Sequence, residues 1–410
     1  MLNHLRSAVP RDVLDLLTSQ MVSLAASMLL TLFTASILGP HGRGVFALVI
    51  GSANLIAQAV SFSLYIGAAN AYRAGDGGAV RTQLLITVSL ALAVLVVGLA
   101  ISFLLPDGTA GVGRIEGILM SILAALLMVQ TFATRTIQGV GLASQYRRLS
   151  MVNALLGLAL GLVGAYTTRS PVPVLMSWAV ASAVTSLASI PTLRRLSSHR
   201  EITVPTREVV ADSGAAHVGN LGQQMLFRAD IPILGALAPM KEVGLYSVAS
   251  PVANLVFMLA ETASMATFGF GRGDNTPEAK ETRYRRILRG YLIVAIPAGI
   301  VVVAAGAWIL PLLLPEFGQT PLLIALLVPG TVVQGVARIG LSSVIARSDQ
   351  RASLTVGIGS ALLSLLYFPA IMLAGAIGAA TASTVIYCAQ AVLVRFVITR
   401  SSRKPAQSHG

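Results

Sequence analysis

Residues 84–105 read LLITVSLALAVLVVGLAISFLL, and this stretch decides the class of fold. It contains no charged residue. A helix needs roughly 20 apolar residues to cross the ~30 Å hydrocarbon core of a bilayer, and this run is long enough. An α-helix satisfies every backbone N–H and C=O inside such a segment, so the run predicts a transmembrane helix.

The same signal recurs along the whole chain. Apolar runs of comparable length lie at residues 16–38, 45–69, 115–138, 149–166, 172–193, 215–237, 243–268, 287–314, 322–345, 354–373 and 377–398. Together with residues 84–105, they predict an all-α polytopic membrane protein with about twelve transmembrane helices.

Composition excludes an ordinary soluble domain. Hydrophobic residues make up 55% of the 410 residues and charged residues 11%, with a mean hydropathy of +0.79. Soluble domains carry about 25% charged residues, so these charges are too few to cover a water-facing surface. A single cysteine, Cys388, excludes an intramolecular disulfide and a cysteine metal cluster. Residues 1–15 lack the apolar core and cleavage site of a removable signal peptide.

The net charge of +13 is distributed in short segments between the apolar runs. Placing the N-terminus in the cytoplasm puts 22 of the 29 Lys and Arg residues in cytoplasmic segments and 4, including Arg43, in outer loops. The other three, Arg135, Arg228 and Arg338, fall inside predicted helices. This bias follows the positive-inside rule and predicts that both termini are cytoplasmic. No continuous basic face exists, which argues against a nucleic-acid partner.

The two halves of the chain resemble each other. Three short segments recur in the same order: ILG at 37–39 and 233–235, GVF at 44–46 with GLY at 244–246, and ANL at 53–55 and 253–255. We therefore predict two six-helix lobes related as parallel repeats. The predicted divisions are an N-terminal lobe, a cytoplasmic linker, a C-terminal lobe and a cytoplasmic tail, at residues 1–193, 194–210, 211–400 and 401–410.

Polar residues follow one face of the first, second and fourth helix of each predicted lobe. Because lipid cannot satisfy polar groups, we expect these faces to line one central cavity. The candidate substrate-binding residues are Arg135, Arg228, Arg338, Gln130, Gln334, Asn54 and Asn254. Two acids on the cavity helices, Asp230 and Glu261, are candidates for ion coupling.

A structural interpretation of these residues stays open beside the functional one. Polar side chains can hold helices together by hydrogen bonds. Arg228 and Asp230 could offset each other's charge, although they would point about 160° apart on one continuous helix. Arg135 lies near a helix end and could extend to the interface, and Glu261 could belong to a buried ion pair.

Enzyme signatures are missing from the sequence. It contains no Walker-A loop, HExxH zinc site or GxSxG nucleophile elbow. The five histidines are scattered without the spacing of metal ligands. We therefore predict that the protein is not an enzyme. The enzyme alternative is a membrane polysaccharide polymerase or glycosyltransferase, but these usually have a large external loop, and the predicted outer loops are short.

Four stretches resemble a known family. They are ILGPHGRGVFALV at 37–49, FRADIPILGALAPMKEVGLYSVA at 227–249, LLPEFGQTPLLIALLVPGTVVQGVAR at 313–338 and GAIGAATASTVIY at 375–387. They are similar to polysaccharide (O-antigen and exopolysaccharide) flippases of the multidrug/oligosaccharidyl-lipid/polysaccharide exporter superfamily. The resemblance spans nearly the whole chain, but its loose motifs specify the superfamily better than the substrate.

The resemblance implies two lobes that form a V around a cavity open alternately to each side of a bacterial plasma membrane. It implies flipping of an undecaprenyl-diphosphate-linked oligosaccharide to the outer leaflet, with Arg135, Arg228 and Arg338 making the cavity cationic. Coupling as an antiporter to Na⁺ or H⁺, with no other cofactor, would follow. So would contact with membrane lipid, a polysaccharide polymerase and a chain-length regulator. The alternative within the superfamily is a cation-coupled multidrug exporter, which favours an acidic cavity.

Overall fold

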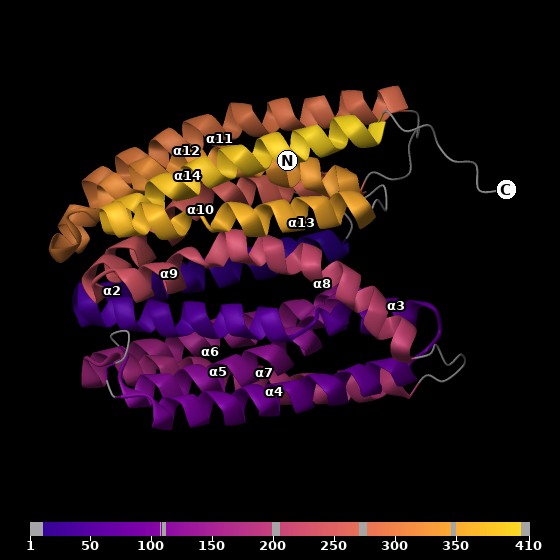
Figure 1. The fold of residues 1–410 in the computed structure, drawn as a ribbon, viewed down its shortest axis with the longest axis horizontal. Coiled ribbons are helices and arrows are strands. Elements are labelled where there is room, and N and C mark those ends of the chain that lie inside the picture. The colour runs from indigo at the N-terminus through magenta and orange to yellow at the C-terminus, as the bar shows by residue number, and fades with distance from the viewer. Residues whose placement is uncertain are drawn as a thin grey trace. The chain divides into compact units, whose positions relative to one another are not determined.

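The computed structural model describes residues 11–106, 108, 112–198, 206–269, 277–345 and 350–402. Those ranges are almost wholly helical and contain no β-strand. Nine of the helices described are long and apolar enough to cross a membrane. Figure 1 shows the helices along the chain. The chain is therefore an all-α, multi-pass membrane protein, as its sequence predicts.

The chain divides into two compact units, which we call unit 1 (Met1–His217) and unit 2 (Val218–Gly410). The predicted N-terminal lobe ends at residue 193, and the predicted C-terminal lobe begins at residue 211. Part of the predicted linker (199–205) and of the predicted tail (403–410) lies outside the described residues. The cytoplasmic location of both segments stays a prediction.

Unit 1 is built from long hydrophobic helices, one short helix and the start of the helix that begins at Thr206. In chain order the complete helices are α2 (Arg11–Val60), α3 (Leu64–Arg73), α4 (Gly78–Leu104), α5 (Arg114–Gly139), α6 (Ala143–Thr168) and α7 (Pro171–Ser197). Local sequence explains two of the starts. Ser170 caps α7 by accepting a hydrogen bond from the Val172 N–H, with Pro171 at the first helical position. Asp76 accepts from the Ala79 N–H in the first turn of α4.

Unit 2 holds the end of α8 and all the helices after it. These elements are α8 (Thr206–Arg228), α9 (Asp230–Leu237), α10 (Met240–Gly269), α11 (Pro277–Leu313), the 3₁₀ helix η2 (Pro315–Phe317), α12 (Thr320–Ile345), α13 (Gln350–Ser364) and α14 (Tyr367–Ser402). The boundary between the units falls inside α8, after His217. His217 belongs to unit 1, where its Nε2 lies 3.1 Å from the Ala59 carbonyl oxygen.

Several predicted helix limits differ from the observed ones. The first predicted helix and most of the second lie in α2, which is divided at Gly39. The φ of 66° at Gly39 lies in the region that glycine adopts without steric strain. The second ends at Val60 rather than residue 69, because Phe62 and Ser63 adopt positive φ. In unit 2, the run at 354–373 is interrupted after Ser364.

These breaks bear on the number of spans. The nine apolar spans count α2 as one helix despite its turn at Gly39. They also count α14 as one helix, although Ala374 and Gly375 are non-helical. The more polar α8 is not among them. The count of about twelve stays a prediction.

Both units pack their helices by one scheme, which supports the internal repeat. Contacts of α5 with α2, α4 and α7 in unit 1 match those of α12 with α10, α11 and α14 in unit 2. The α6–α7 contact likewise matches α13–α14. The fourth helix of the repeat, which is α5 in unit 1 and α12 in unit 2, is thus central in its unit. Figure 1 shows it running alongside its neighbours.

The third helix of each repeat lies at the edge of its unit. In the most apolar window of α4 only 11% of residues are buried, and in that of α11 only 17%, against 61% in α10 and 56% in α12. Large apolar side chains therefore point outward, such as Leu104 on α4 and Trp308 on α11. Lipid is the solvent that suits such faces. By contrast, α10 and α12 bury several polar residues, such as Ser247 and Gln334.

Candidate functional site

An ion pair links two of the predicted site residues in unit 2. Nε of Arg338 on α12 lies 2.8 Å from Oε1 of Glu261 on α10. Nη2 of the same guanidinium donates to Oε2 at 3.2 Å. The side chains are 36% and 26% exposed, so this pair is open to groups outside the unit. Both residues lie in apolar membrane spans, where charges tend to be functional.

Gln334 lies one helical turn before Arg338 and is buried at 3% exposure. Its Oε1 has no hydrogen-bond partner within the described part of the chain. Beside it, the Tyr291 hydroxyl of α11 donates to the Val332 carbonyl at 2.9 Å. Position 335 must be glycine here, since a Cβ would lie 1.9 Å from the Tyr291 hydroxyl oxygen. The glycine lets α11 approach α12 closely at this level.

The matching residues of unit 1 have neutral partners. Arg135 on α5 is exposed and donates to Oε1 of Gln138 on the same helix at 3.0 Å. Gln130, also on α5, is partly buried. Asn54 on α2 is partly buried too, and its Nδ2 donates to the Ile50 carbonyl at 2.9 Å. The repeat spacing of 200 pairs Glu261 with Ser61, so unit 1 has no acid at that position.

The other two predicted cavity residues are exposed. Arg228 is the last residue of α8, and Asn254 lies on α10. The helix predicted to carry both Arg228 and Asp230 is divided at one residue: α8 ends at Arg228, α9 begins at Asp230, and Ala229 between them keeps a right-handed helical conformation. The predicted cavity residues belong partly to unit 1 and partly to unit 2. Their meeting in one cavity stays a prediction.

Asp230 is buried, at 3% exposure, in a network of hydroxyl groups within unit 2. Its Oδ2 accepts from the Tyr246 hydroxyl at 2.7 Å, and its Oδ1 accepts from the Ile231 N–H at 2.8 Å. Tyr246 also lies 3.0 Å from Oγ of Ser383, which in turn lies 3.1 Å from the Tyr367 hydroxyl. Hydrogen-bond donors thus satisfy both carboxylate oxygens in a site closed to bulk solvent.

The residues around Asp230 were missed by the sequence prediction. Tyr246 belongs to α10, and Tyr367 and Ser383 to α14. The sequence gives one signal for Tyr246, its repeat match to Phe46, which lacks the hydroxyl. Nothing in the sequence points to Tyr367 or Ser383, because α14 packs on α9 only in the folded chain.

A buried arginine of unit 1 was also missed. Arg43, assigned from the sequence to an outer loop, is instead inside α2 at 5% exposure. Its Nη1 donates to Thr34 Oγ1 at 3.1 Å and its Nη2 to Thr31 Oγ1 at 3.2 Å. The guanidinium carbon lies 4.9 Å from the centre of the Phe46 ring, a cation–π distance. No carboxylate pairs with Arg43 among the residues described.

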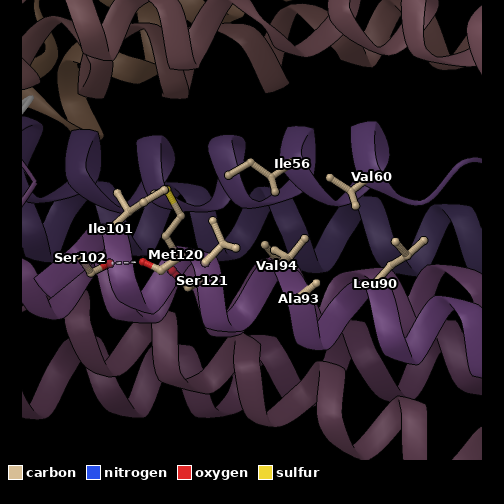
Figure 2. Close-up of a pocket in the computed structure, with 12 residues that line it drawn as sticks. Ile56, Val60, Leu90, Ala93, Val94, Ile101, Ser102, Met120 and Ser121 are labelled. Atoms are coloured by element: carbon tan, nitrogen blue, oxygen red, sulfur yellow. Dashed lines mark hydrogen bonds between the residues drawn. The ribbon is translucent and has the colours of Figure 1, made fainter. Parts of the chain in front are cut away.

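A pocket of about 370 Å³ lies within unit 1 between α2, α4 and α5 (Figure 2). Its walls are apolar, with Ile56 and Val60 from α2, Val94 and Ile101 from α4, and Met120 from α5. Two hydroxyls, of Ser102 and Ser121, lie at one end (Figure 2). None of the predicted site residues lines it, and its chemistry suits a hydrocarbon chain rather than a charged group.

Metal chemistry has no evident centre in the described ranges. No group of three or more His, Cys, Asp or Glu side chains there could hold a metal ion. Of the sequence-predicted site residues in unit 2, Arg228 is exposed, and Arg338 and Glu261 are partly exposed, so these three can offer charge to a ligand.

A family comparison matches more than half of the chain. The profile of a family described as "Polysaccharide biosynthesis protein" matches residues 81–319. No curated protein matches the sequence significantly.

Solved structures share the fold across nearly the whole chain. An inward-facing multidrug resistance MATE family transporter of the MOP superfamily aligns with a TM-score of 0.63 at 16% identity, covering 95% of this chain and 96% of that one. The lipid II flippase MurJ, inward closed, aligns with a TM-score of 0.66 at 12% identity, covering 93% and 87%. A MOP superfamily transporter from Pyrococcus furiosus, described as having a binding pocket of reverse polarity, aligns with a TM-score of 0.56 at 15% identity, covering 96% of each chain.

Proposed function

This chain belongs to the polysaccharide biosynthesis protein family, and we propose that it flips an undecaprenyl-diphosphate-linked oligosaccharide to the outer leaflet by alternating access. Its fold is that of MOP superfamily transporters, and its family and fold relatives are not enzymes. One observation carries the choice of an anionic, lipid-linked cargo. Arg135 and Arg338 lie in apolar spans and Arg228 ends α8, and each arginine is at least partly exposed.

The chemistry of the cargo explains why arginines would be needed. A diphosphate cannot cross hydrocarbon unshielded, because moving an ion out of water is prohibitively unfavourable. Arginine stays charged at any working pH and binds phosphate oxygens with two parallel hydrogen bonds. The candidate contacts are these three arginines, supported by the amides of Gln130, Gln334, Asn54 and Asn254. A polyprenyl tail would remain in the bilayer or in an apolar groove such as the pocket of unit 1.

The competing proposal is a cation-coupled multidrug exporter. The fold shared with a multidrug resistance transporter and the buried acid Asp230 favour it. A polymerase is the weaker alternative, since no family or fold relative reported above is one. The charge of the exposed groups favours the flippase, because a positive surface repels the cationic compounds that an acidic cavity attracts.

For the coupling ion, we propose a proton at Asp230, with Glu261 as a second candidate. The two oxygens of the Asp230 carboxylate accept hydrogen bonds from the Ile231 N–H and the Tyr246 hydroxyl. Sodium would instead need several oxygen acceptors directed at it, as hard cations do. Protonation of Asp230 would change its hydrogen bond with Tyr246 and so favour one of two conformations.

The proposed setting is a bacterial plasma membrane with both termini in the cytoplasm, beside a polysaccharide polymerase and a chain-length regulator. Reporter fusions test the topology. A fusion at Gly410 and one between Arg272 and Arg289 should both report the cytoplasm, because those segments are rich in Lys and Arg. A periplasmic signal from either fusion would refute the topology.

The decisive experiment is reconstitution. Purified protein in proteoliposomes should move a fluorescent undecaprenyl-diphosphate oligosaccharide between leaflets, as measured by loss of signal to a membrane-impermeant reductant. A pH gradient should change the rate. Transport of cationic dyes without movement of the lipid-linked sugar would favour the multidrug exporter instead.

A further inference from the structure

Glu261 contacts the guanidinium of Arg338, which is one of the groups that the proposed function assigns to cargo binding. Nη2 of Arg338 donates a hydrogen bond to Oε2 of Glu261 at 3.2 Å, and Nε lies 2.8 Å from Oε1, an ion-pair distance without hydrogen-bond geometry. A phosphate group binds to this same edge of a guanidinium, where it can accept two parallel hydrogen bonds. We propose that Glu261 is an internal competitor, which holds Arg338 when the cargo is absent and must leave it before a phosphate can bind. This inference rests on the proposed function.

Exposure of the pair makes exchange feasible. With 36% and 26% of the side chains exposed, neither group is fully enclosed by protein, so another ligand can reach the pair. Ion pairs of this kind are weak compared with fully buried ones, so an incoming dianion can displace the carboxylate. The Glu261 carboxylate and a phosphate would also repel each other if both stayed beside the same guanidinium.

The competitor would keep binding reversible. Glu261 is tethered next to Arg338, so its effective concentration is high and constant. The cargo therefore binds more weakly than it would to a free arginine. A transporter needs this, since a headgroup held too tightly would not be released. Binding of a cation to Glu261 would release Arg338 and so link the ion to cargo capture.

The other unit shows what an arginine without a competitor looks like. Arg135 follows Gln130 by five residues on α5, and Arg338 follows Gln334 by four on α12, so the two arginines lie at similar but not identical places in the repeat. The partner of Arg135 is the neutral amide of Gln138 at 3.0 Å. An amide carries no charge to repel a phosphate, so Arg135 is open to the cargo at once. Gln138→Glu would place an acid beside Arg135 in unit 1. This acid would compete with the cargo for Arg135, as Glu261 is proposed to do for Arg338.

The test measures binding of diphosphate compounds rather than transport. Wild-type protein and variants are placed in phosphatidylcholine nanodiscs and titrated calorimetrically. One arm uses undecaprenyl diphosphate, another inorganic diphosphate, and a third replaces part of the lipid with phosphatidylglycerol. The arms distinguish a lipid-linked headgroup, a free anion and a membrane phospholipid as the source of the phosphate.

Opposite effects are expected in the two units. Glu261→Gln should tighten binding of undecaprenyl diphosphate about tenfold, the size expected for one displaced charge contact. Gln138→Glu should weaken it by a similar factor. Arg338→Gln should weaken binding, and Glu261→Gln/Arg338→Gln should bind like Arg338→Gln alone, because Glu261 acts through Arg338.

Each other outcome has a defined meaning. Wild-type affinity or weaker in Glu261→Gln, with melting temperature and gel-filtration profile unchanged, would overturn the competitor role. If Glu261→Gln fails to fold, an unchanged affinity in Gln138→Glu overturns it instead. If the wild type binds none of the diphosphates, the proposed cargo itself is wrong. If phosphatidylglycerol in the nanodisc abolishes the binding of undecaprenyl diphosphate, the site binds phospholipid headgroups and is not a cargo site.

Discussion

The two units share one packing scheme but bury opposite charges at matching places. Counting three residues back from each Ile-Leu-Gly tripeptide pairs Thr34 of unit 1 with Asp230 of unit 2. Phe46 and Tyr246 are likewise paired at a spacing of 200. In unit 1 these positions surround the buried cation of Arg43. In unit 2 they form a buried carboxylate and the hydroxyl that donates to it.

The exposed charges differ between the units in a second way. Arg135 in unit 1 has a neutral partner, whereas Arg338 in unit 2 is paired with an acid. All the acids proposed for coupling therefore belong to unit 2. The comparison suggests a division of tasks, in which unit 1 offers fixed positive charge and unit 2 offers charge that a proton or cargo can change.

The largest expected effect concerns Arg228, the exposed arginine at the end of α8. Arg228→Ala should reduce flipping in proteoliposomes by about 10- to 100-fold, because hydrogen bonds to charged groups contribute about 1.5–3 kcal/mol. Arg228→Lys should keep part of the activity, since the charge survives without the planar fork. Lys241→Ala, at another exposed cation, is the control and should flip normally. Full flipping by single alanine variants of Arg228, Arg135 and Arg338 would refute the cationic cavity.

A second prediction separates the coupling unit from the capture unit. Asp230→Asn should leave insertion and cargo binding intact but make flipping independent of the pH gradient, because the amide cannot take up the proton. Tyr246→Phe should shift the pH at which the rate is half-maximal, since the carboxylate loses one donor. Flipping rates measured in proteoliposomes at a series of pH gradients test both variants. Wild-type gradient dependence in Asp230→Asn would remove this residue from coupling.

Much of the fold was predictable, because long apolar runs report membrane helices directly. The breaks were not, since Leu365 and Leu366 interrupt an apolar run without any change in hydropathy. Positive φ at Phe62 and Ser63 has no sequence signal either, because neither residue type favours that region.

The site was predictable as single charges, but their partners were not. Asp230 and Glu261 stand out as acids among apolar residues. Tyr367 and Ser383 reach the Asp230 network from α14, which only the folded chain brings near. Arg43 follows Gly39, Pro40 and Gly42, a composition typical of loops, so its burial against Thr31 and Thr34 was not foreseen.

A third prediction compares the close helix contacts of the units. In unit 2, a Cβ at Gly222 would lie 1.9 Å from the backbone oxygen of Gly357, so α8 and α13 would have to separate. Gly222→Ala should destabilise the protein by about 1–3 kcal/mol. In unit 1, a Cβ at Gly157 would lie 3.8 Å from the Ala181 Cβ, an ordinary contact. Gly157→Ala should therefore be neutral or slightly stabilising. Equal melting temperatures of the two variants in detergent would contradict this difference.

The smallest expected effect tests the buried charges themselves. Placing a carboxylate in a protein interior normally destabilises it by several kcal/mol, because the ion loses its hydration. At Thr34 the new acid would meet Arg43, whose Nη1 already lies 3.1 Å from the threonine hydroxyl oxygen. Thr34→Asp should thus change the stability of the protein by less than about 1 kcal/mol, since the new attraction offsets the lost hydration.

Thr87 provides the matched control for Thr34, because it is equally buried in unit 1, on α4 rather than α2. Its hydroxyl donates to the Gln83 carbonyl at 2.8 Å, and no cation contacts it among the described residues. Thr87→Asp should therefore show the full loss of several kcal/mol, measured by thermal melting followed through tryptophan fluorescence. Equal losses in Thr34→Asp and Thr87→Asp would mean that Arg43 is not available to an anion. The contrast between a buried cation in unit 1 and a buried carboxylate in unit 2 would then have no energetic consequence.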